Sequence, residues 1–149
     1  MAAQLVLILL AVAAGMTAPV QAGINVHLRS YLHSAYAASF TSFVIGTLAL
    51  AGLLLLRRET VPFGAAFAQA PWWVWSGGFI GAFFVTVSIV VAPRLGAATM
   101  MALFVTGQMI AGLVLDHYGL IGFQQNSATP LRILGAALLI VGVILIRGF

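Results

Sequence analysis

The stretch from Ala35 to Leu56 reads AYAASFTSFVIGTLALAGLLLL and contains no charged side chain. A helix needs about 20 mostly apolar residues to cross a bilayer, so this stretch is long enough to span one. Its apolar residues are continuous, whereas the strands of a membrane β-barrel alternate apolar and polar residues. The stretch therefore predicts a transmembrane helix and an all-α fold.

Four further apolar stretches flank this one, and together they predict a single transmembrane domain over residues 1–149. The five expected helices cover about residues 4–26, 35–56, 72–91, 95–115 and 131–146. The last is short, and it spans if Arg132 and Arg147 extend from its two ends toward the interfaces. The first resembles a secretory signal, but no Lys or Arg precedes its apolar run, which favours a retained span.

The composition excludes most other classes of protein. The chain has six basic and two acidic residues, 63% hydrophobic residues and a mean hydropathy of +1.17. Charged residues make up 5% of it, against about 25% in soluble domains. This argues against a soluble domain, a disordered chain or a nucleic-acid binder, and it predicts contact with membrane lipid. There is no cysteine, and no metal-ligand or cofactor motif appears, so we expect neither a metal nor a cofactor.

Prolines and polar residues mark the expected breaks between the helices. Arg57 to Thr60 ends the second helix, and Pro71 with the nearby tryptophans is typical of a headgroup-level segment before the third. Pro93 is expected to separate the third and fourth helices, because the residue before a proline avoids helical geometry. Thr129 followed by Pro130 predicts an N-cap and first turn for the fifth.

The arginines divide evenly between the two sides of the predicted topology. Arg57, Arg58 and Arg132 lie on the side of the N-terminus, and the opposite side holds Arg29, Arg94 and Arg147. An excess of Lys and Arg on the cytoplasmic side normally sets the orientation of a membrane protein. In this chain neither side has such an excess.

Two interpretations of the even count remain open. One is that a local feature, such as the adjacent Arg57 and Arg58, fixes a single topology. The other is that the chain inserts both ways and pairs as an antiparallel homodimer. Such a dimer would reproduce the ten-helix inverted-repeat architecture of many secondary transporters, of which one chain is half.

Neutral polar groups are the candidate substrate contacts. Thr17, Gln21 and Asn25 follow at intervals of four, so they share one face of the first helix. Pro19 lies among them and frees the carbonyl of Gly15, which predicts a hinge near the middle of the membrane. This polar stripe of Thr17, Gln21 and Asn25 either lines a substrate cavity or provides hydrogen bonds between packed helices.

Gln108 in the fourth helix either lines the substrate cavity or forms a hydrogen bond to a neighbouring helix. It is the fourth candidate for substrate binding. Small residues at helical spacing predict close helix packing. These packing candidates are Gly77, Gly81, Gly107, Gly135 and Gly142.

The charged and ionisable residues lie at the expected helix ends. Without a central carboxylate, a pump that exchanges protons for cations is poorly supported. Arg94 is interpreted as an interfacial anchor, with anion attraction as the alternative. Asp116 and His117 form either a solvated helix end or an acid–base pair. No nucleophile constellation appears, so we do not expect an enzyme.

Several motifs together resemble the half-size, five-helix branch of the drug/metabolite transporter superfamily, the YdcZ-like family. The motifs are Gln21-xxx-Asn25-xx-Leu28, residues 42–47, residues 92–97, residues 104–108, residues 116–119 and the helix from Gly135 to Gly142. The resemblance covers nearly the whole chain. It implies an exporter or permease of the inner membrane, and half of a ten-helix assembly completed by pairing. The four-helix multidrug branch uses a first-helix Glu that this sequence lacks.

The sequence thus predicts a secondary transporter for small organic solutes that works by alternating access as an antiparallel homodimer. A passive channel and a non-transporting subunit of a larger membrane complex are the alternatives.

Overall fold

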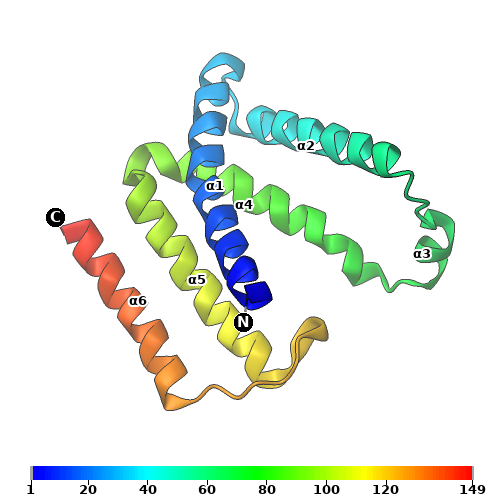
Figure 1. Ribbon diagram of the computed structural model, residues 1–149. Helices are drawn as coiled ribbons and strands as arrows, with labels where there is room; N and C mark the ends of the chain where they lie inside the picture. Colours follow the sequence, from blue (N-terminus) through cyan, green and yellow to red (C-terminus); the bar gives the residue numbers. More distant parts are fainter. Residues whose placement is uncertain (1, 149) are drawn as a thin grey trace. The chain divides into compact units, whose positions relative to one another are not determined.

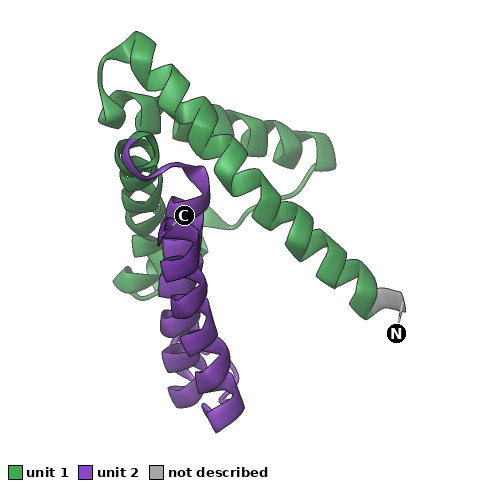
Figure 2. Ribbon diagram, turned by 90° about the vertical axis from the view of Figure 1, so that its left-hand side faces the viewer, with its two compact units in different colours: residues 1–93 green, residues 94–149 purple. Residues whose placement is uncertain are grey.

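The computed structural model describes residues 2–148. The chain divides into two compact units, residues 1–93 and 94–149 (Figure 2). The described residues form helices and connecting turns, and none of them forms a strand. The first unit holds α1 (Ala2–Leu32), α2 (Ala35–Arg57), α3 (Phe63–Gln69), η1 (Trp72–Ser76) and nearly all of α4 (Gly77–Leu95). The second holds α5 (Ala97–Tyr118), η2 (Leu120–Gly122) and α6 (Pro130–Gly148) (Figure 1).

Within the described residues, five helices are long and apolar enough to cross a membrane, which confirms the predicted all-α membrane fold. They run over Gln4–Leu32, Ala35–Arg57, Trp72–Leu95, Ala97–Tyr118 and Pro130–Gly148. The helices extend past several of the expected ends, most of all α1, which continues to Leu32. The polar and aromatic residues after Val26 lower the hydropathy, but none of them is a glycine or proline that would stop a helix.

Local capping explains where α1 and α2 meet. His33 adopts a left-handed conformation with φ of 53°, which stops α1. Ser34 then caps α2, because its Oγ accepts a hydrogen bond of 3.2 Å from the backbone N–H of Ala37. At the other end of the chain, Thr129 Oγ1 accepts from the N–H of Arg132, and α6 begins at Pro130 as expected.

Pro93 does not end the third span, so that expectation is wrong. The helix continues through Pro93 to Leu95, and the break falls at Gly96, whose φ of 76° suits glycine. A proline inside a helix leaves the carbonyl four residues earlier without its usual N–H donor. Here that carbonyl belongs to Ile89, and Arg29 of α1 donates to it from Nη1 at 3.3 Å.

The core of the first unit is small and lies where three helices meet. Ala38 of α2 packs with Val85 and Ile89 of α4, and Val26 and Leu28 of α1 cover them. Most large apolar side chains elsewhere in the described chain are exposed. In a membrane protein such faces contact lipid or another helix, so exposure is the expected state of these side chains.

Candidate functional site

The three predicted polar residues of α1 have different surroundings. Thr17 is exposed, and its hydroxyl donates to the carbonyl of Ala14 in the same helix at 2.7 Å. Gln21 is exposed. Asn25 is only 3% exposed, and its Nδ2 has no hydrogen-bond partner. The stripe therefore runs from an exposed end at Thr17 to a buried end at Asn25.

The unpartnered amide of Asn25 is costly. A buried donor without an acceptor costs about 1–3 kcal/mol, and most buried polar side chains avoid this cost by pairing. Its neighbour on the same helix face, Ala22, is also buried, at 4% exposure. A side chain kept in this state is a candidate for contact with a group from outside the chain.

The predicted hinge lies inside a continuous helix. Both Gly15 and Pro19 belong to α1, which runs on past them to Leu32. Gln108 is exposed on α5 in the second unit.

The packing glycines differ in their surroundings. A Cβ atom added to Gly81 would lie 3.3 Å from the ring of Phe43, so this glycine leaves room for the Phe43 ring of α2 against α4. The same addition at each of the other four would meet nothing within 4 Å in the described chain; these are Gly77, Gly107, Gly135 and Gly142.

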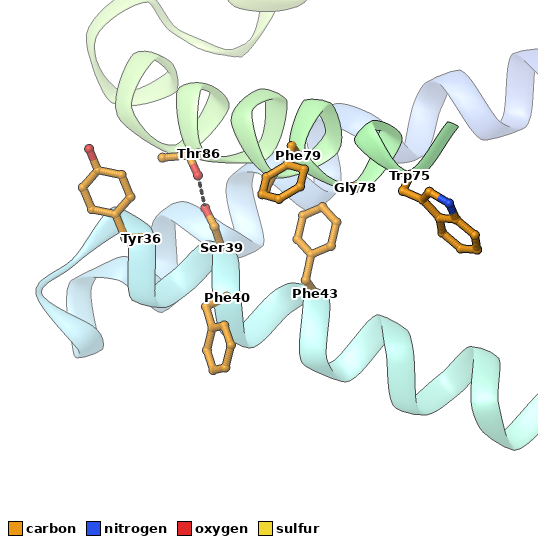
Figure 3. Close-up of a pocket in the computed structure, with 9 residues that line it drawn as sticks. Tyr36, Ser39, Phe40, Phe43, Trp75, Gly78, Phe79 and Thr86 are labelled. Atoms are coloured by element: carbon orange, nitrogen blue, oxygen red, sulfur yellow. Dashed lines mark hydrogen bonds between the residues drawn. The ribbon is translucent and has the colours of Figure 1, made fainter. Parts of the chain in front are cut away.

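A cleft between α2 and α4 was not predicted from the sequence. The two helices run in opposite directions, because Ser39 contacts Thr86 while Phe43 contacts Gly81. The hollow between them has a volume of about 470 Å³, which is in the range of small-molecule pockets. Nine residues line it: Tyr36, Ser39, Phe40, Phe43, Trp75, Gly78, Phe79, Ala82 and Thr86 (Figure 3). We call it the aromatic cleft, since five of these side chains are aromatic.

Two hydroxyl groups supply the polar part of the aromatic cleft. Thr86 Oγ1 donates to Ser39 Oγ at 2.9 Å, and Ser39 Oγ donates to the carbonyl of Ala35 at 3.0 Å (Figure 3). Ser39 is 4% exposed, and Thr86 is half-buried. At the other end, the ring of Trp75 stacks on Phe67 of α3, with centroids 4.3 Å apart.

The connection between α5 and α6 is held by the residues at its two ends. Asp116 forms an ion pair with Arg132, and not the predicted alternative pair with His117. Arg132 also donates to the carbonyl of Asn126 at 2.7 Å, and His117 Nδ1 accepts from the N–H of Ala128 at 3.1 Å. These contacts give Asp116 and His117 a structural role in the second unit.

Comparisons with known proteins identify a family of inner membrane proteins. A family model described as "Putative inner membrane exporter, YdcZ" matches residues 6–145. The inner membrane protein YdcZ of Escherichia coli strain K12 is 31% identical over 140 residues, which cover 91% of this chain and 90% of that protein. No solved structure matches the chain.

The family match and the five apolar helices together place the protein in the inner membrane with several passes and a transporter-type role. The chain belongs to the YdcZ-like family of the drug/metabolite transporter superfamily.

Proposed function

We propose that the chain is a secondary transporter for small organic solutes that works by alternating access as an antiparallel homodimer. The observation that carries the proposal is the buried, unpartnered amide of Asn25 in an apolar helix. Intramembrane polar groups are expensive and are kept mainly where they serve a pathway. In a state of the transporter that opens access to this buried atom, a solute that accepts a hydrogen bond from Nδ2 would satisfy the donor.

In the proposed mechanism, Thr17, Gln21, Asn25 and Gln108 line the transport cavity. Pro19 removes one hydrogen bond from α1 and lets the helix bend near Gly15 as the two halves rock against each other. Neutral amides and hydroxyls suit an uncharged or weakly polar solute, because no carboxylate is available at mid-membrane to pair with a cation.

Two features support pairing of two copies. The arginines are divided three against three between the sides, so neither orientation is favoured by charge. In addition, Gly107 on α5 and Gly135 and Gly142 on α6 face open space in the described chain. Small residues of this kind are typical of surfaces where membrane helices approach closely, and a second copy would supply the partner.

Reporter fusions at the C-terminus test the dual topology. We expect both a periplasmic reporter (alkaline phosphatase) and a cytoplasmic reporter (green fluorescent protein) to be active on the wild-type chain. Replacing Arg57 and Arg58 with Ala leaves an excess of arginine on the side of the C-terminus. That side should then face the cytoplasm, so only the cytoplasmic reporter should remain active. Replacing Arg94 and Arg147 with Ala should give the opposite result. A wild-type chain that activates a single reporter would overturn the antiparallel homodimer.

Solute counterflow in proteoliposomes tests the transport mechanism. A thermal-stabilisation screen on the purified protein first identifies solutes that bind. We then expect an excess of unlabelled solute inside the vesicles to drive saturable uptake of labelled solute, because an alternating-access carrier exchanges one for the other. Flux without counterflow would indicate a channel, and binding without flux would indicate a non-transporting subunit.

A further inference from the structure

The direction of the hydrogen bonds in the aromatic cleft follows from counting protons. The carbonyl of Ala35 can only accept, so the single hydroxyl proton of Ser39 must point to it. Since that proton is used, the contact between Ser39 and Thr86 can be made only by the proton of Thr86. Both protons are therefore committed, and the pair offers only oxygen lone pairs to the cleft.

Thr86 is the better placed of the two acceptors. It lines the cleft and is half-buried, and its Oγ1 keeps two lone pairs. Ser39 already accepts from Thr86 and is almost fully buried. A ligand in the cleft would thus meet a hydrogen-bond acceptor at Thr86 and no hydroxyl donor from this pair.

The walls of the aromatic cleft favour a flat aromatic ring, and their described residues hold no carboxylate that could pair with a cation. Figure 3 shows the rings of Phe43 and Phe79 in the space between α2 and α4, with Trp75 toward one end. Aromatic rings favour stacked or edge-to-face contact with another ring. No acidic residue is among the lining residues of the described chain, and a cation leaving water needs a paired anion.

We propose that the aromatic cleft binds neutral aromatic compounds that carry one N–H or O–H donor, as phenols and indoles do. A lipid acyl chain that fills the same space has no donor and leaves the lone pairs of Thr86 without a hydrogen bond. A compound with a donor should therefore bind in the cleft more tightly than an acyl chain. The aromatic cleft contains none of the four residues proposed to line the transport cavity, so it is a second site. Binding itself requires neither transport nor pairing of two copies.

A matched pair of probes tests the inference: 2-naphthol carries the donor, and 2-methoxynaphthalene has the same rings with the donor replaced by an ether. We expect the wild-type protein in lipid nanodiscs to bind 2-naphthol roughly five- to tenfold more tightly, which is the effect of one net hydrogen bond. Fluorescence titration of each probe measures this ratio, and nanodiscs without protein give the partition background.

Two variants test whether the difference in affinity between the two probes arises in the aromatic cleft. Thr86→Val keeps the shape of the side chain and removes its oxygen, so the two probes should bind with similar affinity. Phe79→Leu should weaken both probes by roughly three- to tenfold through the loss of ring contact and keep their ratio. Phe123→Leu, an exposed position in the α5–α6 connection, is the control and should change neither.

The outcomes separate this inference from the proposed function. Equal binding of both probes to wild type, or an unchanged ratio in Thr86→Val, would overturn the inference. If Thr86→Val does not fold, the Phe79→Leu titration decides, and unchanged affinities would overturn it. Selective binding of 2-naphthol without counterflow of any solute would leave the site established and contradict the transporter.

Discussion

Proteoliposomes that contain the Asn25→Leu variant are expected to show no saturable solute flux, although the variant unfolds at a higher denaturant concentration than wild type. The two effects have one cause. The Nδ2 donor of Asn25 is buried without an acceptor, and an apolar side chain of similar size removes this unmet donor. The variant should therefore gain stability, by about 1–3 kcal/mol.

The same substitution removes the group that would hold the solute. A gain in stability together with a loss of function is typical of functional sites, where a group is kept despite its cost to the fold. The exposed Gln21, one turn earlier, should behave differently, because Gln21→Leu removes no unmet buried group. We expect it to abolish flux with little change in stability.

Gln4→Leu is the matched control. Gln4 is an exposed amide near the start of the same helix and outside the proposed cavity. Its replacement should leave flux and stability unchanged. Counterflow and the free energy of unfolding in mixed micelles measure the two properties separately. Flux that survives both Gln21→Leu and Asn25→Leu would show that the stripe only stabilises helix packing.

Apolar length alone located the helices, as α2 illustrates. The expected helix from Ala35 to Leu56 and the observed helix from Ala35 to Arg57 differ by one residue. Helix breaks were harder to predict where a distant residue replaces a local bond. Pro93 was expected to end a helix because the residue before a proline avoids helical geometry. The helix continues instead, and the carbonyl of Ile89 that Pro93 leaves without an N–H accepts from Arg29, which lies 60 residues before Ile89. A local sequence pattern cannot predict a contact between residues that are so far apart in the sequence.

The aromatic cleft could not be predicted from the sequence either. Ser39 and Thr86 are 47 residues apart, and each alone is an ordinary hydroxyl that helices usually bond to their own backbone. Asn25 could be predicted as a candidate contact, because it follows Thr17 and Gln21 at intervals of four on the helix that contains Pro19. Its burial beside the exposed Gln21 could not be foreseen, since periodicity places both on the same face.

Replacing Arg29 with Leu should destabilise the protein by about 1–3 kcal/mol, because it leaves the carbonyl of Ile89 without a donor. Ile89 is fully buried at 0% exposure, so water cannot replace the guanidinium there. Arg147→Leu is the matched control, since Arg147 is an exposed arginine in the last turn of α6. The free energy of unfolding in mixed micelles should change little for that variant.

A double-mutant cycle with Pro93 shows whether this carbonyl is the cause. Pro93→Ala restores a backbone N–H four residues after Ile89, so the carbonyl regains a donor within its own helix. In that background Arg29→Leu should cost clearly less than in wild type, with a coupling of roughly 1 kcal/mol. Equal costs in both backgrounds would mean that Arg29 acts through its charge or its packing alone. A reduced cost means that one arginine supplies the missing bond of a proline in another helix, which lets α4 cross Pro93 and still pack against α1.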